Sequence, residues 1–376
     1  MKKTVSIILT LALIFSSFAV MNAFAVSFSD LEGHWGKSYI DVLVNDGTIN
    51  GYDDGTFRPD GTVTRAEFVK MIGKGSEKTD VVYTDVPADH WGYDYIMYSG
   101  LDVSGTQFMP DKAITRGEVL NLIWKRNGSK TGISAPSVIT SQSDNKDAVA
   151  WGYTYGIMTG DDGLNLRLGD TLTRAEGAAL IVRAREINEN SPAKDFADIV
   201  SPDVLKAVFN SQTLFDREYN PDSAFTNGEM ARAVLRFGSR QYNLTFKNVS
   251  AVNELDCEYG KEFYVTRGET LGGTPNTAEF VGKNANVGDT LSEMCYNLIK
   301  LVTKSAKFDT SASYPDVTSA DSTQKKYLDY AASNGICLFA DGKIHPDKEI
   351  TMKEFAAVLL QLDAVIGTQV SYASDG

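Results

Sequence analysis

The stretch Phe57-Arg58-Pro59-Asp60-Gly61-Thr62-Val63-Thr64-Arg65-Ala66-Glu67-Phe68 carries the pattern that decides the fold. Thr64 and Glu67 have the spacing of a capping box, in which the threonine hydroxyl accepts from the third helical amide and the glutamate accepts from the cap amide. Apolar residues follow four, five and eight positions after the threonine, at Phe68, Val69 and Ile72. This spacing is one face of a helix, so the stretch predicts an extended loop that leads into an amphipathic helix.

The capping pattern returns along the whole chain. Thr-x-x-Glu followed by an apolar stripe occurs six times, at intervals of 51 to 64 residues. We assign structural caps to Thr64 with Glu67, Thr115 with Glu118, Thr173 with Glu176, Thr226 with Glu229, Thr290 with Glu293, and Thr351 with Glu354. These six pairs define six units, which we number 1 to 6 in chain order.

Most units show similar local signals before the cap. In unit 1 the aromatic-x-Asp-aliphatic motif Phe28-Ser29-Asp30-Leu31 comes first, and a helical stretch that ends at Gly47 follows. A large apolar residue lies seven positions before the threonine, as Phe57 does. The sequence of each unit therefore predicts a helix, a Gly-rich loop with a short extended piece, and a capped helix. Because about 55 residues can barely bury a core alone, we expect neighbouring units to pack together.

The composition excludes several classes of protein. The chain has 376 residues, a net charge of −13, three Cys and three His. So few Cys exclude a small scaffold held by disulfides, and so few His leave little material for a metal site. The acidic balance argues against nucleic acid bound by bulk charge. We therefore expect no cofactor, no metal and no nucleic-acid partner.

The first 25 residues have the features of a secretory signal peptide. Lys2 and Lys3 precede an apolar run from Val5 to Val20, and Ala23-Phe24-Ala25 forms a small-residue cleavage pattern. No second run is long enough to span a membrane. No Cys lies near the cleavage site, and the chain ends without a hydrophobic sorting tail. We expect an exported protein, without a membrane span after cleavage, that is held at the cell non-covalently.

These residues resemble S-layer homology (SLH) domains. In unit 1 the resemblance runs from Phe28-Ser29-Asp30 through His34-Trp35, Gly51-Tyr52 and Phe57-Arg58-Pro59-Asp60 to Thr64-Arg65-Ala66-Glu67. Unit 2 keeps Asp85, His90-Trp91 and Thr115-Arg116-Gly117-Glu118, and unit 3 keeps Thr173-Arg174-Ala175-Glu176 but lacks the His-Trp pair. Units 4 to 6 keep the helix spacing but lose the arginine, which puts binding by these units in doubt.

The resemblance implies a mainly α fold in which SLH modules form pseudo-threefold bundles, here two triplets. It also implies binding of secondary cell-wall polysaccharide, often through a pyruvylated amino sugar, in the wall or S-layer of a bacterium. The predicted domains are the signal peptide (1–25), SLH modules at 26–78, 79–130 and 131–190, and SLH-like repeats at 191–240, 241–310 and 311–376. The fifth unit is expected to hold a small β-rich insertion around 241–282.

The arginine after the capping threonine is the strongest candidate for ligand binding. Arg65, Arg116 and Arg174 fall at the first helical position, where a cation opposes the helix dipole at a cost of about 0.3–1 kcal/mol. Free helix amides and a guanidinium together suit a carboxylate. The alternative is an inherited exposed arginine, or one paired with a nearby Asp. If these arginines contact the ligand, replacing Arg65 and Arg116 with alanine should weaken wall binding and leave the melting temperature nearly unchanged.

Two further residue pairs are candidates for the ligand groove. Trp35 and Trp91 suit stacking on a sugar face, and equally suit filling the junction between units. Asp30 and Asp85 suit accepting bonds from sugar hydroxyls, and equally suit capping the helix that follows them.

Three functions remain open at this point. The leading one is a non-catalytic protein that binds wall polysaccharide through units 1 to 3. The second is a structural S-layer or surface-assembly protein whose second triplet contacts other surface-layer proteins. The third is a wall-active enzyme with its catalytic part in 241–310, where paired carboxylates such as Glu254 and Asp256 occur.

Overall fold

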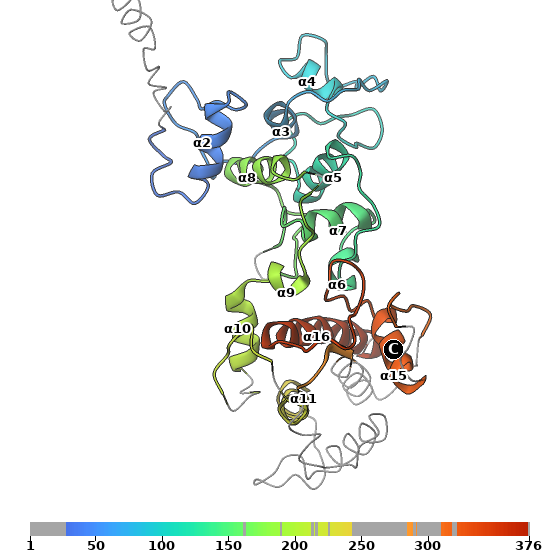
Figure 1. The fold of residues 1–376 in the computed structure, drawn as a ribbon. Coiled ribbons are helices and arrows are strands. Elements are labelled where there is room, and N and C mark those ends of the chain that lie inside the picture. The colour runs from blue at the N-terminus through green and yellow to red at the C-terminus, as the bar shows by residue number, and fades with distance from the viewer. Residues whose placement is uncertain are drawn as a thin grey trace, which may run out of the picture.

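The computed structural model describes residues 28–242, 284–288, 291, 310–317 and 322–374, except positions 161–162, 189, 212–213, 215–216 and 225. The predicted signal peptide and the predicted β-rich insertion lie outside the described residues. Over the described part the fold is mainly helical, as expected. The helices gather in two groups, with α6 and α9 between them (Figure 1).

The first group comes from units 1 to 3, and the second comes from units 4 to 6. The helices of units 1 and 2 are α2 (Lys37–Asn45), α3 (Arg65–Ile72), α4 (Tyr93–Met97) and α5 (Arg116–Arg126). Unit 3 contains α6 (Ser137–Thr140), α7 (Lys146–Thr154) and α8 (Arg174–Arg185). The second group contains α9 (Phe196–Ile199), α10 (Pro202–Ser211), α11 (Asn227–Tyr242), α15 (Ser322–Ser333) and α16 (Met352–Ser374).

The second helix of each of units 1 to 3 begins at a complete capping box. At α3, α5 and α8 the threonine hydroxyl accepts from the glutamate amide, and the glutamate carboxylate accepts from the threonine amide. Thr226 with Glu229 and Thr351 with Glu354 make the same reciprocal bonds. Each box satisfies two helix amides that would otherwise lack partners.

The extended residues just before the caps join units 1 to 3 in a closed ring. The amide of Val63 donates to the carbonyl of Leu172 at 3.1 Å, that of Leu172 to Ile114 at 3.2 Å, and that of Ile114 to Val63 at 3.0 Å. All three side chains are almost fully buried. Because every unit both donates to one neighbour and accepts from the other, the three units share one core.

A second ring of the same kind joins units 4 to 6. Its isolated backbone bridges are Ala224 with Thr351, Thr226 with Asn284, and Asn286 with Glu349. The corresponding bridges of the first ring are Thr62 with Thr173, Thr64 with Ala113, and Thr115 with Thr171. In both rings each cap residue is bridged to the residue two positions before the next cap.

In unit 5 the bridged residue at the cap position is Asn286. The bridges put Asn286 in the position that Thr64 has in unit 1, and the amide of Val287 donates to Lys348 as that of Arg65 donates to Lys112. The predicted cap residues Thr290 and Glu293 lie outside the described residues. Asn is as good an N-cap as Thr, and the two residues that follow Asn286, Val287 and Gly288, are helical.

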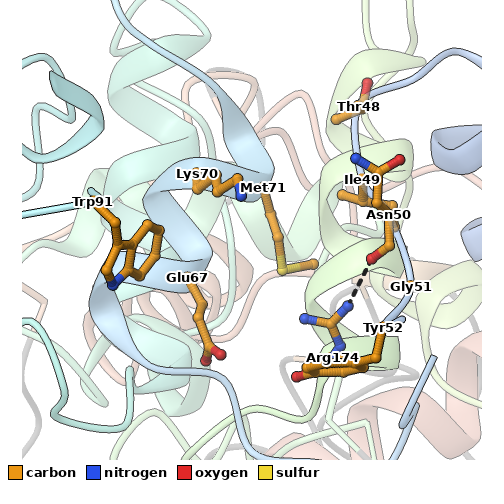
Figure 2. A pocket seen from close by; sticks show the side chains of 10 residues that line it. All are labelled: Thr48, Ile49, Asn50, Gly51, Tyr52, Glu67, Lys70, Met71, Trp91 and Arg174. Carbon is orange, nitrogen blue, oxygen red and sulfur yellow. Dashed lines mark hydrogen bonds between the residues drawn. The ribbon is translucent and has the colours of Figure 1, made fainter. Parts of the chain in front are cut away.

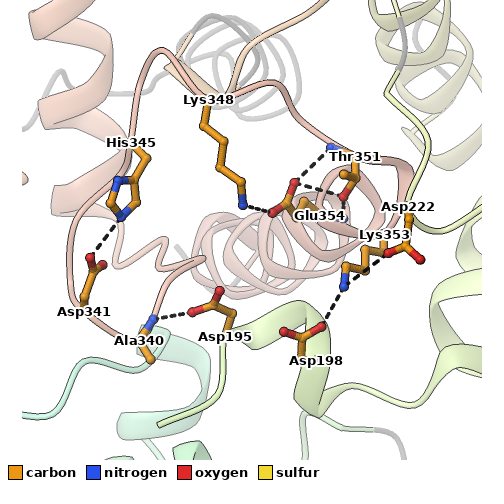
Figure 3. A network of polar contacts seen from close by, with 10 residues as sticks. All are labelled: Asp195, Asp198, Asp222, Ala340, Asp341, His345, Lys348, Thr351, Lys353 and Glu354. Carbon is orange, nitrogen blue, oxygen red and sulfur yellow. Dashed lines mark hydrogen bonds and ion pairs between the residues drawn. The ribbon is translucent and has the colours of Figure 1, made fainter. Parts of the chain in front are cut away.

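Hydrogen bonds also join unit 4 to unit 6 within the second group. The amide of Phe196 donates to Leu338, and that of Ala340 donates to Asp195 Oδ1 at 2.9 Å. Beside this contact, Lys353 lies between Asp198 at 2.8 Å and Asp222 at 3.5 Å (Figure 3). These bonds fix the start of unit 4 against unit 6.

Candidate functional site

The three arginines that follow the caps are buried where the units of the first ring meet. Arg65, Arg116 and Arg174 are 5%, 8% and 8% exposed. Each donates to the backbone carbonyl seven positions before the next cap in the ring: Arg65 to Phe108, Arg116 to Leu166, and Arg174 to Phe57. Each guanidinium therefore joins two units.

This burial corrects the expectation of an arginine that the fold could lose without cost. A buried carbonyl that loses its donor costs about 1–3 kcal/mol, and more when a charged partner is also stranded. The arginines therefore stabilise the ring, whether or not they also face a ligand. The sequence could not show this, because their acceptors come from other units.

A first groove, of about 300 Å³, lies between unit 1 and its two neighbours (Figure 2). Unit 1 supplies the loop 48–52 and the α3 residues Glu67, Lys70 and Met71. Unit 3 supplies Arg174 at the start of α8, and unit 2 supplies Trp91. Figure 2 shows Trp91, Lys70 and Glu67 on one side and Arg174 with Tyr52 on the other.

A second groove, of about 360 Å³, lies around unit 3 in the same way. Unit 3 supplies the loop 157–160 and the α8 residues Glu176, Ala179, Leu180 and Arg183. Unit 2 supplies Arg116 and unit 1 supplies Trp35. Each groove thus combines the loop and capping glutamate of one unit, the arginine of the unit before it in the ring, and the tryptophan of the unit after it.

The tryptophan side chain that lines each groove is exposed to solvent. Trp35 is 55% exposed and Trp91 is 56% exposed, so neither fills a buried junction between units. Lys70 Nζ lies 5.5 Å from the Trp91 ring centroid, which orients that ring beside the groove. Unit 3 has Asp144 in the corresponding place, one residue before the cap of α7, and so offers no ring at the third junction.

The charge at the three arginines differs between junctions. Arg65 forms an ion pair with the half-buried Glu118, which also lies 3.8 Å from Lys112. Arg116 Nη1 lies 3.5 Å from Glu176. Within the described residues Arg174 has no such carboxylate partner and donates to the carbonyls of Phe57 and Asn50. The first groove therefore offers the arginine with the least compensated charge.

Asp30 and Asp85 serve the loop of their own unit. Asp30 accepts from the amides of Phe57 at 2.9 Å and Arg58 at 2.7 Å, and Asp85 accepts from the corresponding amides of Phe108 and Met109. Arg58 and Met109 have positive φ angles of 57° and 55°, a conformation that costs free energy in a non-glycine residue. The carboxylates thus fix a strained turn, and their oxygens face backbone amides rather than the grooves.

Comparison with known proteins identifies one domain of the chain. The S-layer homology domain profile matches residues 27–69, which span Asp30, Trp35, the first-groove loop and the cap of α3. Residues 27–69 are an S-layer homology domain. The neighbouring units take part in the same ring and have the same cap geometry.

Several of the relatives found by sequence are named as surface proteins, and others are named as enzymes. The chain is 37% identical to a cellulosome-anchoring protein of Acetivibrio thermocellus over 22% of this chain and 21% of that protein. It is 33% identical to cell surface glycoprotein 1 of the same species over 24% of this chain and 4% of that protein. It is 26% identical to the surface-layer 125 kDa protein of Lysinibacillus sphaericus over 50% of this chain and 17% of that protein.

The chain thus covers about a fifth or less of the length of each of these relatives. The SLH domain and these surface proteins support a location at the cell wall or S-layer. In the part of the chain that the structure describes, no helix has the length and apolar character needed to span a bilayer. Among the same residues, no three His, Cys, Asp or Glu side chains gather as metal ligands.

Two cations of the grooves were not predicted from the SLH pattern. Lys70 lies on the solvent side of α3, and Arg183 lies in the last turn of α8. Arg183 donates to the carbonyl of Ile157 and lies 5.3 Å from the Tyr39 ring centroid. The only available signal was their position on the polar face of a capped helix, which solvent-exposed cations share.

The SLH units should lose stability in acid. Burial opposes the charge of Asp30 and Asp85, but the two backbone amides at each carboxylate outweigh it and lower the pKa below the ordinary 3.8. A lowered folded-state pKa means that the stabilisation is complete above pH 3.8 and is lost as the pH falls through the folded-state value. We expect the melting temperature to fall steeply below about pH 4.

The matched variant for this prediction is Asp30→Asn with Asp85→Asn. We expect this variant to melt lower than the wild type at pH 7 and to lose less between pH 5 and pH 2.5, because the two titrating groups are gone. Thermal unfolding, monitored by circular dichroism, measures the melting temperature at pH 7 and its change between pH 5 and pH 2.5. Equal pH dependence of the two proteins would show that these aspartates do not control acid stability.

Proposed function

We propose that the chain attaches non-covalently to the bacterial cell wall by binding secondary cell-wall polysaccharide in the first and second grooves. The observation that carries the proposal is the shared composition of the grooves, each with an arginine, an exposed tryptophan and a capping glutamate from three different units. Two grooves built alike from separate parts of the sequence favour binding over a purely structural role for these residues.

The side chains of the first groove suit an acidic sugar. Arg174 and Lys70 give two positive charges against one carboxylate, Glu67, so a ligand carboxylate meets a net positive site. The exposed Trp91 ring offers an apolar face on which a sugar ring can stack. A pyruvylated amino sugar has such a carboxylate and such a face. The overall negative charge of the protein does not oppose this recognition, because the cations are local.

The unit boundaries of the proposal follow the two rings. We propose that units 1 to 3 form one pseudo-threefold SLH triplet over about 26–190, and that units 4 to 6 form a diverged triplet over 191–376. The cyclic exchange of backbone bonds in each ring supports this division.

The alternative function uses the second triplet for contacts with other surface proteins. Its support is the first helical position after each cap, which is occupied by Asn227, Val287 and Met352, all buried. Without a guanidinium at any of these three positions, the second ring lacks the feature that suits the grooves to an anion. We propose that the chain is non-catalytic as a whole. The predicted enzymatic segment, 241–310, lies mostly outside the described residues.

Tryptophan fluorescence tests the proposed binding. Trp35 and Trp91 are exposed, whereas Trp151 is fully buried, so a ligand in the grooves changes mainly the red-shifted part of the emission. Wall polysaccharide released from sacculi should shift this emission to the blue and saturate. The same polysaccharide after removal of its pyruvate should shift it at least tenfold more weakly. An equal response to both samples would refute recognition of the carboxylate.

A further inference from the structure

The two grooves open on opposite faces of one helix, α8. Glu176, Ala179, Leu180 and Arg183 line the second groove, and their spacing puts all four on one face of the helix. Arg174 lines the first groove and lies on the opposite face by the same period of 3.6 residues. The body of α8 therefore separates the two grooves.

The grooves are also independent in their composition. The first is lined by the loop 48–52, three α3 residues, Trp91 and Arg174; the second is lined by Trp35, Arg116, the loop 157–160 and the four α8 residues. No residue belongs to both sets. A ligand in one groove therefore occupies no side chain that a ligand in the other groove would contact.

A helix with its side chains is about 10–12 Å across, and a sugar unit that fills one groove would have to turn around this width to reach the other. The two grooves also belong to different units of a ring, so they face different directions around it. We therefore expect that a short stretch of polymer bound in one groove does not also enter the second groove.

We infer that the chain is a bivalent cross-bridge that binds two separate strands of wall polysaccharide at once, one in each groove. This inference rests on the proposed function. Cross-bridging adds a second activity to anchoring, because each bound chain joins two polymer strands of the wall. The third junction takes no part, since Asp144 stands where a tryptophan is needed and Arg65 is neutralised by Glu118.

Stoichiometry tests the inference directly. Size-fractionated wall polysaccharide released from sacculi and carrying one fluorophore at its reducing end is titrated into the full chain, and sedimentation velocity counts the strands bound. We expect two strands per chain for the wild type, one for Trp91→Ala, one for Trp35→Ala, and none for the double variant. On intact walls we expect each single variant to be retained at least 100-fold less tightly, because bivalent attachment is lost.

The outcomes separate the inference from the proposed function. Saturation of the wild type at one strand, with tighter binding than in either single variant, would show one strand spanning both grooves and would overturn cross-bridging while leaving polysaccharide binding intact. Saturation at one strand that only one tryptophan variant abolishes would show a single active groove and would also overturn it. Absence of binding by all four proteins would refute the proposed function itself.

Discussion

Replacing Trp35 and Trp91 together with alanine is expected to abolish retention on cell walls without lowering the melting temperature. Both rings are more than half exposed, so the fold loses little buried area when they are removed. A central aromatic contact in a binding site contributes about 2 kcal/mol or more, which is about 30-fold in affinity for each groove. Because one protein carries both grooves, the two losses combine.

Wall sedimentation measures this effect. Labelled protein is mixed with sacculi, and the bound fraction is determined over a range of wall concentrations, beside a thermal melt of each variant. Val82→Ala is the matched control, because Val82 is 78% exposed and lines neither groove. Wild-type retention by the double variant would show that the two grooves do not bind the wall. A large fall in its melting temperature would mean that the tryptophans hold the fold.

The second large effect is expected in stability. Arg65→Ala strands the half-buried Glu118 and leaves the carbonyl of Phe108 without its donor. Breaking a buried ion pair by removing one partner costs about 3–5 kcal/mol. For a folded unit of 150–250 residues, this corresponds to a fall of about 10 °C in melting temperature. Protonation of Glu118 in acid should restore only part of the lost stability of Arg65→Ala, because the carbonyl of Phe108 still lacks its donor.

Two further variants sharpen the test of Arg65. Arg185→Ala removes a surface arginine that pairs with Asp46 and should cost less than about 1 kcal/mol. Arg65→Lys keeps the charge but cannot reach the Phe108 carbonyl and the Glu118 carboxylate together, so we expect only partial recovery. Equal melting temperatures for Arg65→Ala and Arg185→Ala would contradict a structural role for the buried arginine.

The local structure was predictable because its determinants are close together in sequence. Thr64 and Glu67 are three residues apart and settle a helix start by themselves. The predicted cap of unit 5, Thr290 with Glu293, lies outside the described residues, and Asn286 has the bridged position there that the capping threonine has in the other units. The bridge from Asn286 goes to Glu349 of unit 6, so the sequence of unit 5 alone does not predict it.

The candidate site was predictable in its residue types but not in its assembly. The sequence singled out Arg174 and Trp91, yet it could not show that they face each other across a groove built on unit 1. The roles of the aspartates also depended on distant partners. The residues next to Asp30 in sequence predict a helix cap or a sugar ligand. In the structure Asp30 accepts from the backbone amides of Phe57 and Arg58.

Unit 3 shows how the fold can be kept when the motif is lost. It has no aromatic-x-Asp motif, and Gln142 Oε1 accepts instead from the amide of Leu166 at 2.9 Å. The adjacent Arg167 has the same positive φ, 51°, as its counterparts, and its amide donates to Asn165. Two neutral side chains thus replace one carboxylate, a substitution that the repeat pattern could not predict.

Retention on walls with and without their polysaccharide tests the proposed binding directly. The mature protein is incubated with intact sacculi and with sacculi from which the wall polysaccharide has been stripped, and the bound fraction is compared at equal peptidoglycan. We expect strong retention on the intact walls and loss of at least nine-tenths of it on the stripped walls. Equal retention on both would show that the protein holds to peptidoglycan or to another wall component, and would contradict polysaccharide recognition by the two grooves.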